Sequence, residues 1–235
     1  SSRSLKAKKL LAGPQHIDYD LFGTVTGRLT TRKNSFPMLT IGKEFRQLLK
    51  PQNDWFLSLD YNAAEVRTFI ALSGKEQPTV DVHDWHRSNL IKKDISREEA
   101  KVRFFAWIYN HSSSVTDFDS YDRNSVVEKN YSDGIITTPF KRKIKVDRFK
   151  ALNYLIQSTT SDLVLERALA IDKFLEGKRS FISHIVHDEI VIDLAAAEND
   201  LSGDLKEIFA KNKLDTFRVN LKAGKDYYNL ETLKL

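Results

Sequence analysis

Cysteine is absent from this chain of 235 residues, and glycine and proline are scarce, with nine and five copies. Without cysteine the protein can form no disulfide, no cysteine-ligated zinc or iron–sulfur centre and no thiol nucleophile. The composition, with 41% hydrophobic and 29% charged residues, indicates a sizeable buried core and argues against disorder. No apolar run approaches the roughly 18 residues of a membrane helix, and the N-terminus lacks the apolar core of a signal peptide. We therefore expect a globular, cytoplasmic protein with one large domain or two small ones.

Basic residues outnumber acidic residues by 37 to 32, which gives a formal net charge of +5. This excess alone is common among soluble proteins, but its distribution is uneven. Six cations fall within ten residues: Lys141, Arg142, Lys143, Lys145, Arg148 and Lys150. Such a cluster can neutralise phosphates and release counterions. It is equally typical of a solvated surface loop, so the charge pattern leaves nucleic-acid binding open.

Helices and strands are expected to alternate irregularly, which predicts an α+β protein. A buried strand is predicted over 55–60, and a capping box at Ser96 and Glu99 predicts a helix that runs to about Tyr109. The remaining expected helices cover 63–72, 85–91, 148–175 and 198–211, and the remaining strands cover 135–138, 143–146, 181–186, 190–194 and 217–221. The polar segment 110–132 is expected to be a loop.

The first candidate functional segment is Asp60-Tyr61-Asn62-Ala63-Ala64-Glu65-Val66-Arg67. Asp60 ends a buried strand and precedes a helix, where a cation could reach its carboxylate. The alternative is that Asp60 only caps the helix.

The second segment is the capped helix with Arg97, Lys101, Phe105 and Tyr109. Spacing by four residues places these side chains on one face. Cations followed by aromatic rings suit a nucleoside triphosphate, although an amphipathic helix with buried rings and snorkelling cations explains the same pattern.

The third segment is His187-Asp188-Glu189, between two hydrophobic strands. It could bind a metal ion or form an exposed turn. Zinc is disfavoured, because His184 and His187 point to opposite faces of a strand and nothing completes the His83 and His86 pair.

In this order the three segments resemble motifs A, B and C of the family A DNA polymerases. Thr26-Gly27-Arg28-Leu29 is similar to another segment of the family, and Asn153 with Gln157 resembles its template-side helix. The resemblance spans about residues 23–194. Two positions depart from the family: Asn110 stands where the family usually has glycine, and the middle of motif A is Asn-Ala-Ala.

The resemblance implies a right-hand polymerase palm with an antiparallel sheet and a mainly helical fingers subdomain. Residues 1–74 would form the N-terminal segment and palm, 75–147 the fingers and hairpin, and 148–235 the rest of the palm. The thumb and a proofreading exonuclease would come from other segments or chains. The compact motifs favour a phage-type member in a bacterial or phage-infected host cell.

The resemblance also implies a role for each candidate residue. Two Mg²⁺ ions, for which Mn²⁺ can substitute, would be held by Asp60, the Tyr61 backbone carbonyl, Asp188 and Glu189. Asp60 and Asp188 would be catalytic, with Lys101 as a proton donor. The incoming nucleotide would contact Glu65, His86, Arg97, Lys101, Phe105 and Tyr109, with Glu65 as a steric gate against ribonucleotides. Primer–template DNA would contact Arg28, Asn153, Gln157 and His187.

The expected activity is template-directed addition of deoxynucleotides (dNTPs) to a primer 3′ end, in DNA replication or repair. A single-subunit RNA polymerase and a non-catalytic DNA-binding module are the alternatives. Glu65 favours deoxynucleotides over ribonucleotides, and the carboxylate pair has no use in a pure binding module.

Overall fold

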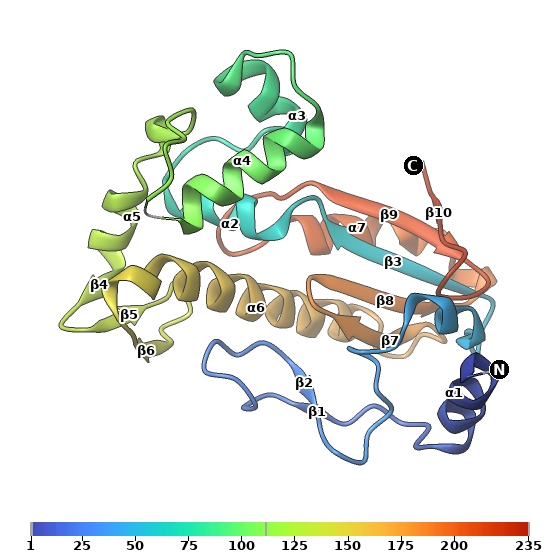
Figure 1. The fold of residues 1–235 in the computed structure, drawn as a ribbon. Coiled ribbons are helices and arrows are strands. Elements are labelled where there is room, and N and C mark those ends of the chain that lie inside the picture. Colours follow the sequence, from blue (N-terminus) through green and yellow to red (C-terminus); the bar gives the residue numbers. More distant parts are fainter. Residues whose placement is uncertain (1, 111, 235) are drawn as a thin grey trace. The chain divides into compact units, whose positions relative to one another are not determined.

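The computed structural model describes residues 2–110 and 112–234. The chain forms two compact units, each built from segments that are distant in sequence (Figure 1). Unit 1 comprises Ser1–Tyr61, Val164–Ala210 and Val219–Leu235, and unit 2 comprises Asn62–Leu163 and Lys211–Arg218. The predicted palm and fingers segments have boundaries that differ from those of the two units. The division into palm and fingers stays a prediction.

Unit 1 contains an antiparallel sheet in the order β10-β9-β3-β8-β7. The central strand β3 (Trp55–Tyr61) pairs with β8 (Glu189–Leu194) on one side and β9 (Val219–Gly224) on the other. The edges are β7 (Phe181–Val186) and the short β10 (Glu231–Thr232). Leu57 and Leu59 are fully buried, as expected for a strand with neighbours on both sides.

The two faces of β3 have different environments because successive side chains alternate. On one face, Tyr61 stacks on Phe209 of α7 (Leu201–Ala210), with ring centroids 4.0 Å apart, and donates a hydrogen bond to the Phe209 carbonyl. On the other face, Phe56 joins a buried cluster with Phe36 and Phe45. Asp60 lies on the same face of β3 as Phe56.

The rest of unit 1 is largely short elements, and the sequence predicted none of those near the N-terminus. They are α1 (Ser2–Ala12), β1 (Tyr19–Asp20), β2 (Thr30–Thr31), a 3₁₀ helix over Lys43–Leu48 and another over Ala196–Glu198. The last part of the long helix α6 (Arg148–Phe174) also belongs to this unit.

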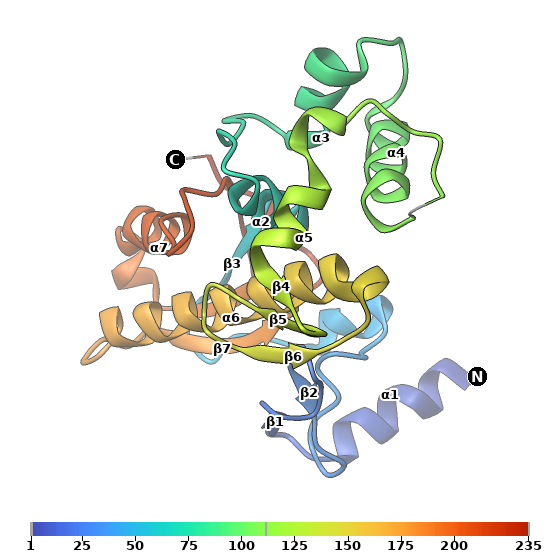
Figure 2. The same cartoon turned by 90° about the vertical axis from the view of Figure 1, so that its left-hand side faces the viewer.

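Unit 2 is mainly helical (Figure 2). Its helices are α2 (Ala64–Leu72), α3 (Val82–His86) continued by a π-helical turn (Arg87–Ile91), α4 (Arg97–Tyr109), a 3₁₀ turn (Asp119–Tyr121), α5 (Arg123–Asn130) and the first part of α6. A small antiparallel sheet of β4 (Tyr131–Ser132), β5 (Ile135–Thr137) and β6 (Lys143–Lys145) precedes α6.

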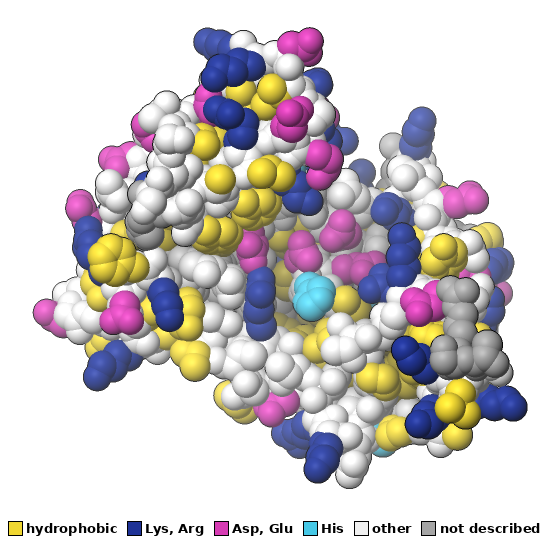
Figure 3. All heavy atoms as spheres, in the orientation of Figure 1, with side chains coloured by type: hydrophobic (Ala, Val, Ile, Leu, Met, Phe, Trp, Pro, Cys, Tyr) yellow, Lys and Arg dark blue, Asp and Glu magenta, His cyan; other side chains and the backbone are white. Residues whose placement is uncertain are grey.

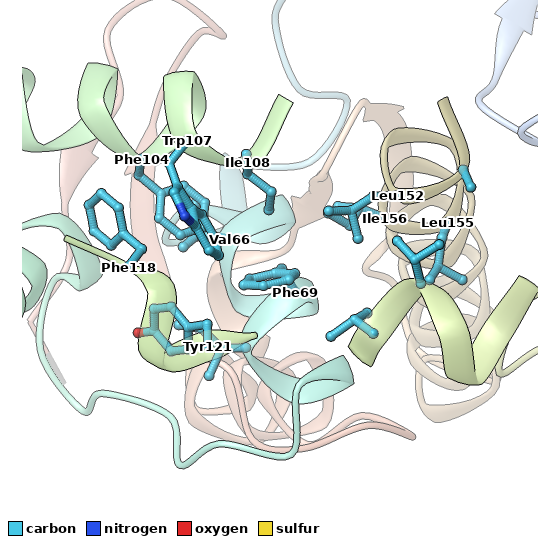
Figure 4. Close-up of a cluster of buried hydrophobic side chains, with 14 of the residues drawn as sticks. Val66, Phe69, Phe104, Trp107, Ile108, Phe118, Tyr121, Leu152, Leu155 and Ile156 are labelled. Carbon is cyan, nitrogen blue, oxygen red and sulfur yellow. The ribbon is translucent and has the colours of Figure 1, made fainter. Parts of the chain in front are cut away.

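Aromatic side chains dominate the core of unit 2. Phe69 of α2 is fully buried, and its ring centroid lies 5.7 Å from those of Trp107 and Tyr121 and 6.1 Å from that of Phe104. Figure 4 shows Phe69 between these rings and the aliphatic side chains of α6. The core therefore joins α2, α4 and α6, which are far apart in the sequence of this unit.

Most predicted elements are confirmed, and the α+β class with antiparallel sheets is confirmed as well. The capping box is present, with the Ser96 hydroxyl accepting from the Glu99 N–H at 3.1 Å and the Glu99 carboxylate accepting from the Ser96 N–H at 2.7 Å. Helices α2 and α6 end before Gly74 and Gly177, which both adopt positive φ. No helix in the described ranges combines the length and the apolar character needed to cross a bilayer.

The prediction of a loop over 110–132 is wrong at α5. Asp122 caps this helix by accepting a hydrogen bond from the Ser125 N–H at 3.2 Å, and only Val126 and Val127 are buried. Two adjacent apolar residues give no helical periodicity, so the helix depends on tertiary burial that the sequence pattern does not reveal.

Replacing Phe69 with alanine should destabilise unit 2 by about 3–5 kcal/mol, because a cavity replaces the ring at the centre of the cluster. Urea unfolding followed by tryptophan fluorescence measures this, since Trp107 reports on the same cluster. Val102→Ala is the control, because this α4 side chain is 67% exposed and should change stability by no more than about 0.5 kcal/mol. Equal effects of the two substitutions would contradict the central role of the aromatic cluster.

Candidate active site

Three carboxylates gather at one end of the unit 1 sheet. Asp60 lies opposite Glu189 of β8 and opposite Asn220 of β9, whose side-chain amide donates to Asp60 Oδ2 at 3.4 Å. Asp188 lies in the two-residue turn that joins β7 to β8, after His187, whose φ of 55° is in the left-handed region. Acidic side chains gather over these strands in Figure 3.

The carboxylates repel one another electrostatically. Burial and the negative charges of Asp188 and Glu189 together raise the pKa of Asp60 to about 7, although Asn220 and Lys222 oppose the shift. Asp60 thus carries a proton more readily than an ordinary aspartate. Either a proton or a bound cation can relieve the accumulated charge.

Glu189 is held by two hydroxyl donors. Its Oε1 accepts from the Ser58 hydroxyl at 2.6 Å, and its Oε2 accepts from the Tyr227 hydroxyl at 2.8 Å. Burial and the charge of Glu189 raise the pKa of Tyr227, so this phenol stays a neutral donor. Ser58, Tyr227 and Asn220 were not among the site residues predicted from the sequence. Ser58 could have been found from its alternation with Asp60, but no sequence pattern marks the other two.

The donor chemistry at this end of the sheet fits Mg²⁺, which prefers hard oxygen ligands. In the ranges 2–110 and 112–234 no three Asp, Glu or His side chains form a complete metal-binding group. Mg²⁺ commonly binds one or two carboxylates and takes its other ligands from water and substrate phosphates. Asp60 and Asp188 are the two residues here that could form such a pair. The Tyr61 side chain faces α7, which leaves only its backbone to contribute.

In unit 2, residues predicted from two different motifs come together. The rings of Phe105 and Tyr109 stack with centroids 5.9 Å apart, and the Tyr109 hydroxyl donates to Glu65 Oε2 at 2.9 Å. This hydrogen bond fixes the Glu65 carboxylate beside the aromatic face of α4. The predicted juxtaposition of two rings on one helix face is confirmed.

The two predicted cations on α4 differ in their surroundings. Arg97 donates from Nε and Nη2 to both oxygens of Asp81, at 3.0 and 2.7 Å, and contacts Glu98. Despite burial, hydrogen bonds from Arg97, Asn62 and the Asp84 N–H hold the pKa of Asp81 well below its usual range. Lys101 Nζ lies 3.9 Å from Glu98 Oε2, a looser ion pair. Lys101 is therefore the more available cation.

The prediction that His86 contacts a triphosphate is wrong in this structure. Its ring is fully buried, stacks on Phe104 with centroids 5.1 Å apart, and shares a 2.8 Å hydrogen bond with the Tyr121 hydroxyl. Burial lowers the pKa of His86 to about 3, helped by His83 and Arg67, so the ring is neutral at pH 7. Its role is therefore structural.

Arg67 is a second buried group whose role the sequence did not show. Its guanidinium is fully buried and donates to the carbonyls of Asn62, Pro78 and Val80 at 2.7–2.8 Å. Burial and the charge of Arg218 lower the pKa of Arg67 to about 10, so it stays a cation. It ties the start of α2 to the loop that leads to Asp81.

The predicted DNA-binding residues are distributed over both units. In unit 1, Arg28 is exposed after the turn at Gly27, and His187 is exposed on the β7–β8 turn. In unit 2, Gln157 Nε2 donates to Asn153 Oδ1 at 2.6 Å on α6. The structure therefore confirms that Asn153 and Gln157 are neighbours, and their contact with DNA stays a prediction.

Two curated proteins with detectable sequence similarity to this chain are phage DNA polymerases. The chain is 28% identical over 175 residues to the DNA polymerase of Mycobacterium phage D29 and 24% identical over 181 residues to that of Mycobacterium phage L5. These alignments cover 59% and 65% of this chain but only 28% and 30% of the phage proteins. The chain thus spans less than a third of the curated relatives. No protein-family model matches it.

The fold matches that of a solved polymerase domain. The POL domain of Pol1 from M. smegmatis, in complex with DNA primer–template and dNTP, superposes with a TM-score of 0.76 at 18% sequence identity. The match covers 95% of this chain and 51% of that chain. These comparisons confirm the resemblance to DNA polymerases that the motifs indicate.

Asp60→Asn should stabilise the metal-free protein at pH 8 much more than at pH 4. The pKa of Asp60 is about 7 in the folded state against 3.8 as the reference value, so stability decreases as the pH rises through this window. Asparagine has no proton to lose. The free energy of unfolding should therefore be about 2 kcal/mol higher in the variant at pH 8. Urea unfolding in EDTA at the two pH values measures it.

The matched control is Asp226→Asn. Hydrogen bonds from Asn229 and Lys50 lower the pKa of Asp226 to about 2 against the effect of burial, so its titration lies below pH 4. Its substitution should change stability by nearly equal amounts at both pH values. The same pH dependence in the two variants would argue against charge repulsion at Asp60.

Proposed function

We propose that this chain is the palm and fingers portion of a template-directed DNA polymerase, which adds deoxynucleotides to a primer 3′ end in replication or repair. The observation that carries the proposal is the mutual repulsion of Asp60, Asp188 and Glu189 at one end of the sheet. A bound cation would relieve this repulsion, and the fold around the site matches a polymerase domain. Primer–template DNA and dNTPs would be the substrates, in the cytoplasm of a bacterial or phage-infected cell.

In this proposal Asp60 and Asp188 hold two Mg²⁺ ions, with the Tyr61 carbonyl assisting and Glu189 nearby. When bound, such ions activate the primer 3′-hydroxyl and stabilise the charge on the leaving pyrophosphate. Ser58 and Tyr227 fix the orientation of the Glu189 carboxylate through their hydrogen bonds. Glu189 therefore adds a fixed negative charge to the site.

The α4 face of unit 2 would bind the incoming nucleotide. Lys101 contacts the triphosphate and donates a proton to pyrophosphate, and Arg97 contributes charge while it remains bound to Asp81. Phe105 and Tyr109 offer their rings to the base and sugar. Glu65, held by the Tyr109 hydroxyl, lies where an extra 2′-hydroxyl would have to fit.

Asp60→Asn and Asp188→Asn should each reduce primer extension about a thousandfold while DNA affinity changes little. Loss of a metal-holding carboxylate removes several kcal/mol of transition-state stabilisation, and each 1.36 kcal/mol corresponds to a factor of ten. Single-turnover extension with Mg²⁺ and DNA-binding titrations measure both effects. Asp204→Asn, an exposed position on α7, controls for the change in charge. Near-normal extension by either variant would exclude that carboxylate as a metal ligand.

Glu65→Ala should raise the ratio of kcat/KM for ribonucleotides to that for deoxynucleotides by about 10- to 100-fold, because the carboxylate no longer excludes the 2′-hydroxyl. Tyr109→Phe should move the ratio in the same direction by a smaller factor, since only the hydrogen bond that fixes Glu65 is lost. Competition of both nucleotides on one primer measures the ratio. Glu76→Ala removes an exposed carboxylate of the same unit as a control. A constant ratio in the Glu65 variant would revive the RNA polymerase alternative.

A further inference from the structure

The end of β7 that leads into the β7–β8 turn has little strand pairing of its own. β7 is an edge strand, so within the described sheet it pairs with β8 alone. A register shift between Ile182 and His184 interrupts this pairing, and only the pairs from His184 to Val186 lie between the shift and the turn. A ladder is locally disrupted at such an irregularity. The backbone that leads into Asp188 is therefore held by few hydrogen bonds from the sheet itself.

The turn also adopts a conformation that disfavours its first residue. His187 is the first of the two turn residues, and its φ is 55°. Two-residue hairpin turns require positive φ at this position, which is why glycine and asparagine prevail there. The Cβ of a histidine makes this conformation costly, so neighbouring contacts must maintain it.

Tyr19 of β1 supplies a contact of this kind. Its hydroxyl donates to the Ile185 carbonyl at 2.6 Å and accepts from the Ile185 N–H at 2.8 Å. Two residues that face each other in a hydrogen-bonded pair of an antiparallel ladder exchange two such bonds. Here a single phenol makes both of them, on the side of β7 that faces away from β8 (Figure 1). The hydroxyl thus takes the place of a neighbouring strand at the position two residues before the turn.

The phenol is itself held in place and keeps its proton. Tyr19 pairs with Thr31 of β2, and the N–H of the preceding Asp18 donates to the Ser35 hydroxyl at 2.7 Å. Burial raises the pKa of Tyr19 to about 12, against the opposing effect of the hydrogen bond with Ile185. The hydroxyl therefore stays protonated at neutral pH and can donate and accept at the same time.

We propose that Tyr19 is a positioning residue for the carboxylate site, because its hydroxyl holds Ile185 and thereby the turn that carries Asp188. The expected effect on catalysis rests on the proposed function above, whereas the expected effect on the turn does not. Tyr227 makes the corresponding contact after the turn, where its hydroxyl donates to the Glu189 side chain. A tyrosine that only supported the fold would affect unit 1 as a whole, whereas a positioning tyrosine affects the turn and its carboxylate first.

Tyr19→Phe tests the proposal, because it removes the hydroxyl and keeps the ring. Amide hydrogen exchange, followed by NMR in EDTA, should become about tenfold faster at Ile185 and at the two turn residues but not in the pairing of β3 with β8. Mn²⁺ binding to the protein alone, followed by electron paramagnetic resonance, should weaken about tenfold. In single-turnover primer extension with Mg²⁺, the maximal rate should decrease about tenfold while the KM for dNTP changes less than about twofold.

Tyr131→Phe is the matched control. The Tyr131 hydroxyl donates to the Val146 carbonyl at 3.0 Å in unit 2, so this variant also loses a hydrogen bond from a phenol to the backbone. It should leave exchange at Ile185, Mn²⁺ affinity and the maximal rate as in the wild type.

The proposal is overturned if Tyr19→Phe leaves exchange at the turn and Mn²⁺ affinity unchanged. It is also overturned if exchange accelerates equally throughout unit 1, as a general loss of stability would cause. Primer extension by the wild type tests the polymerase function separately. Absent extension, together with Mn²⁺ binding that depends on the Tyr19 hydroxyl, would refute the polymerase function and leave the role of Tyr19 in place.

Discussion

The alternation of side chains along β3 is the constraint on which the carboxylate site depends. Tyr61 points toward α7 and Asp60 points the other way, and both orientations follow from pairing with β8 and β9 in one register. A slip by one residue would turn Asp60 toward Phe209 and place Tyr61 opposite Glu189. The apolar contacts of Tyr61 therefore determine where the acidic group lies, although they take no part in its chemistry.

The same site lowers the stability of the folded chain. Asp60 and Glu189 face each other across paired strands, and Asp188 adds a third charge, so the metal-free protein retains electrostatic repulsion that Asn220 and Lys222 only partly offset. Arg67 in unit 2 shows the opposite arrangement, because carbonyl groups surround the buried cation and satisfy its donors. The buried charge of Arg67 is thus fully hydrogen-bonded, whereas the repulsion among the three carboxylates is only partly offset.

Local signals explain how much could be predicted from the sequence. The capping box at Ser96, the strand that contains Asp60 and the four-residue spacing of Phe105 and Tyr109 depend on neighbours a few residues apart, and the structure contains all three. The hydrogen bond from Tyr227 to Glu189 joins residues 38 positions apart, and the burial of His86 depends on rings from α4 and beyond. No spacing rule reports such contacts, so they could not be predicted.

The order of strands in unit 1 also affects how the protein folds during synthesis. β3 occupies the centre of the sheet, yet its partners β8 and β9 begin at Glu189 and Val219, more than a hundred residues later in the chain. Contacts of such high sequence separation form slowly, because a long loop must close before any strand pairing is gained. The β7–β8 hairpin, by contrast, is local and can form as soon as it leaves the ribosome. A nascent chain therefore exposes the hydrophobic β3 until both β8 and β9 have emerged, and during that time the strand can pair with other chains.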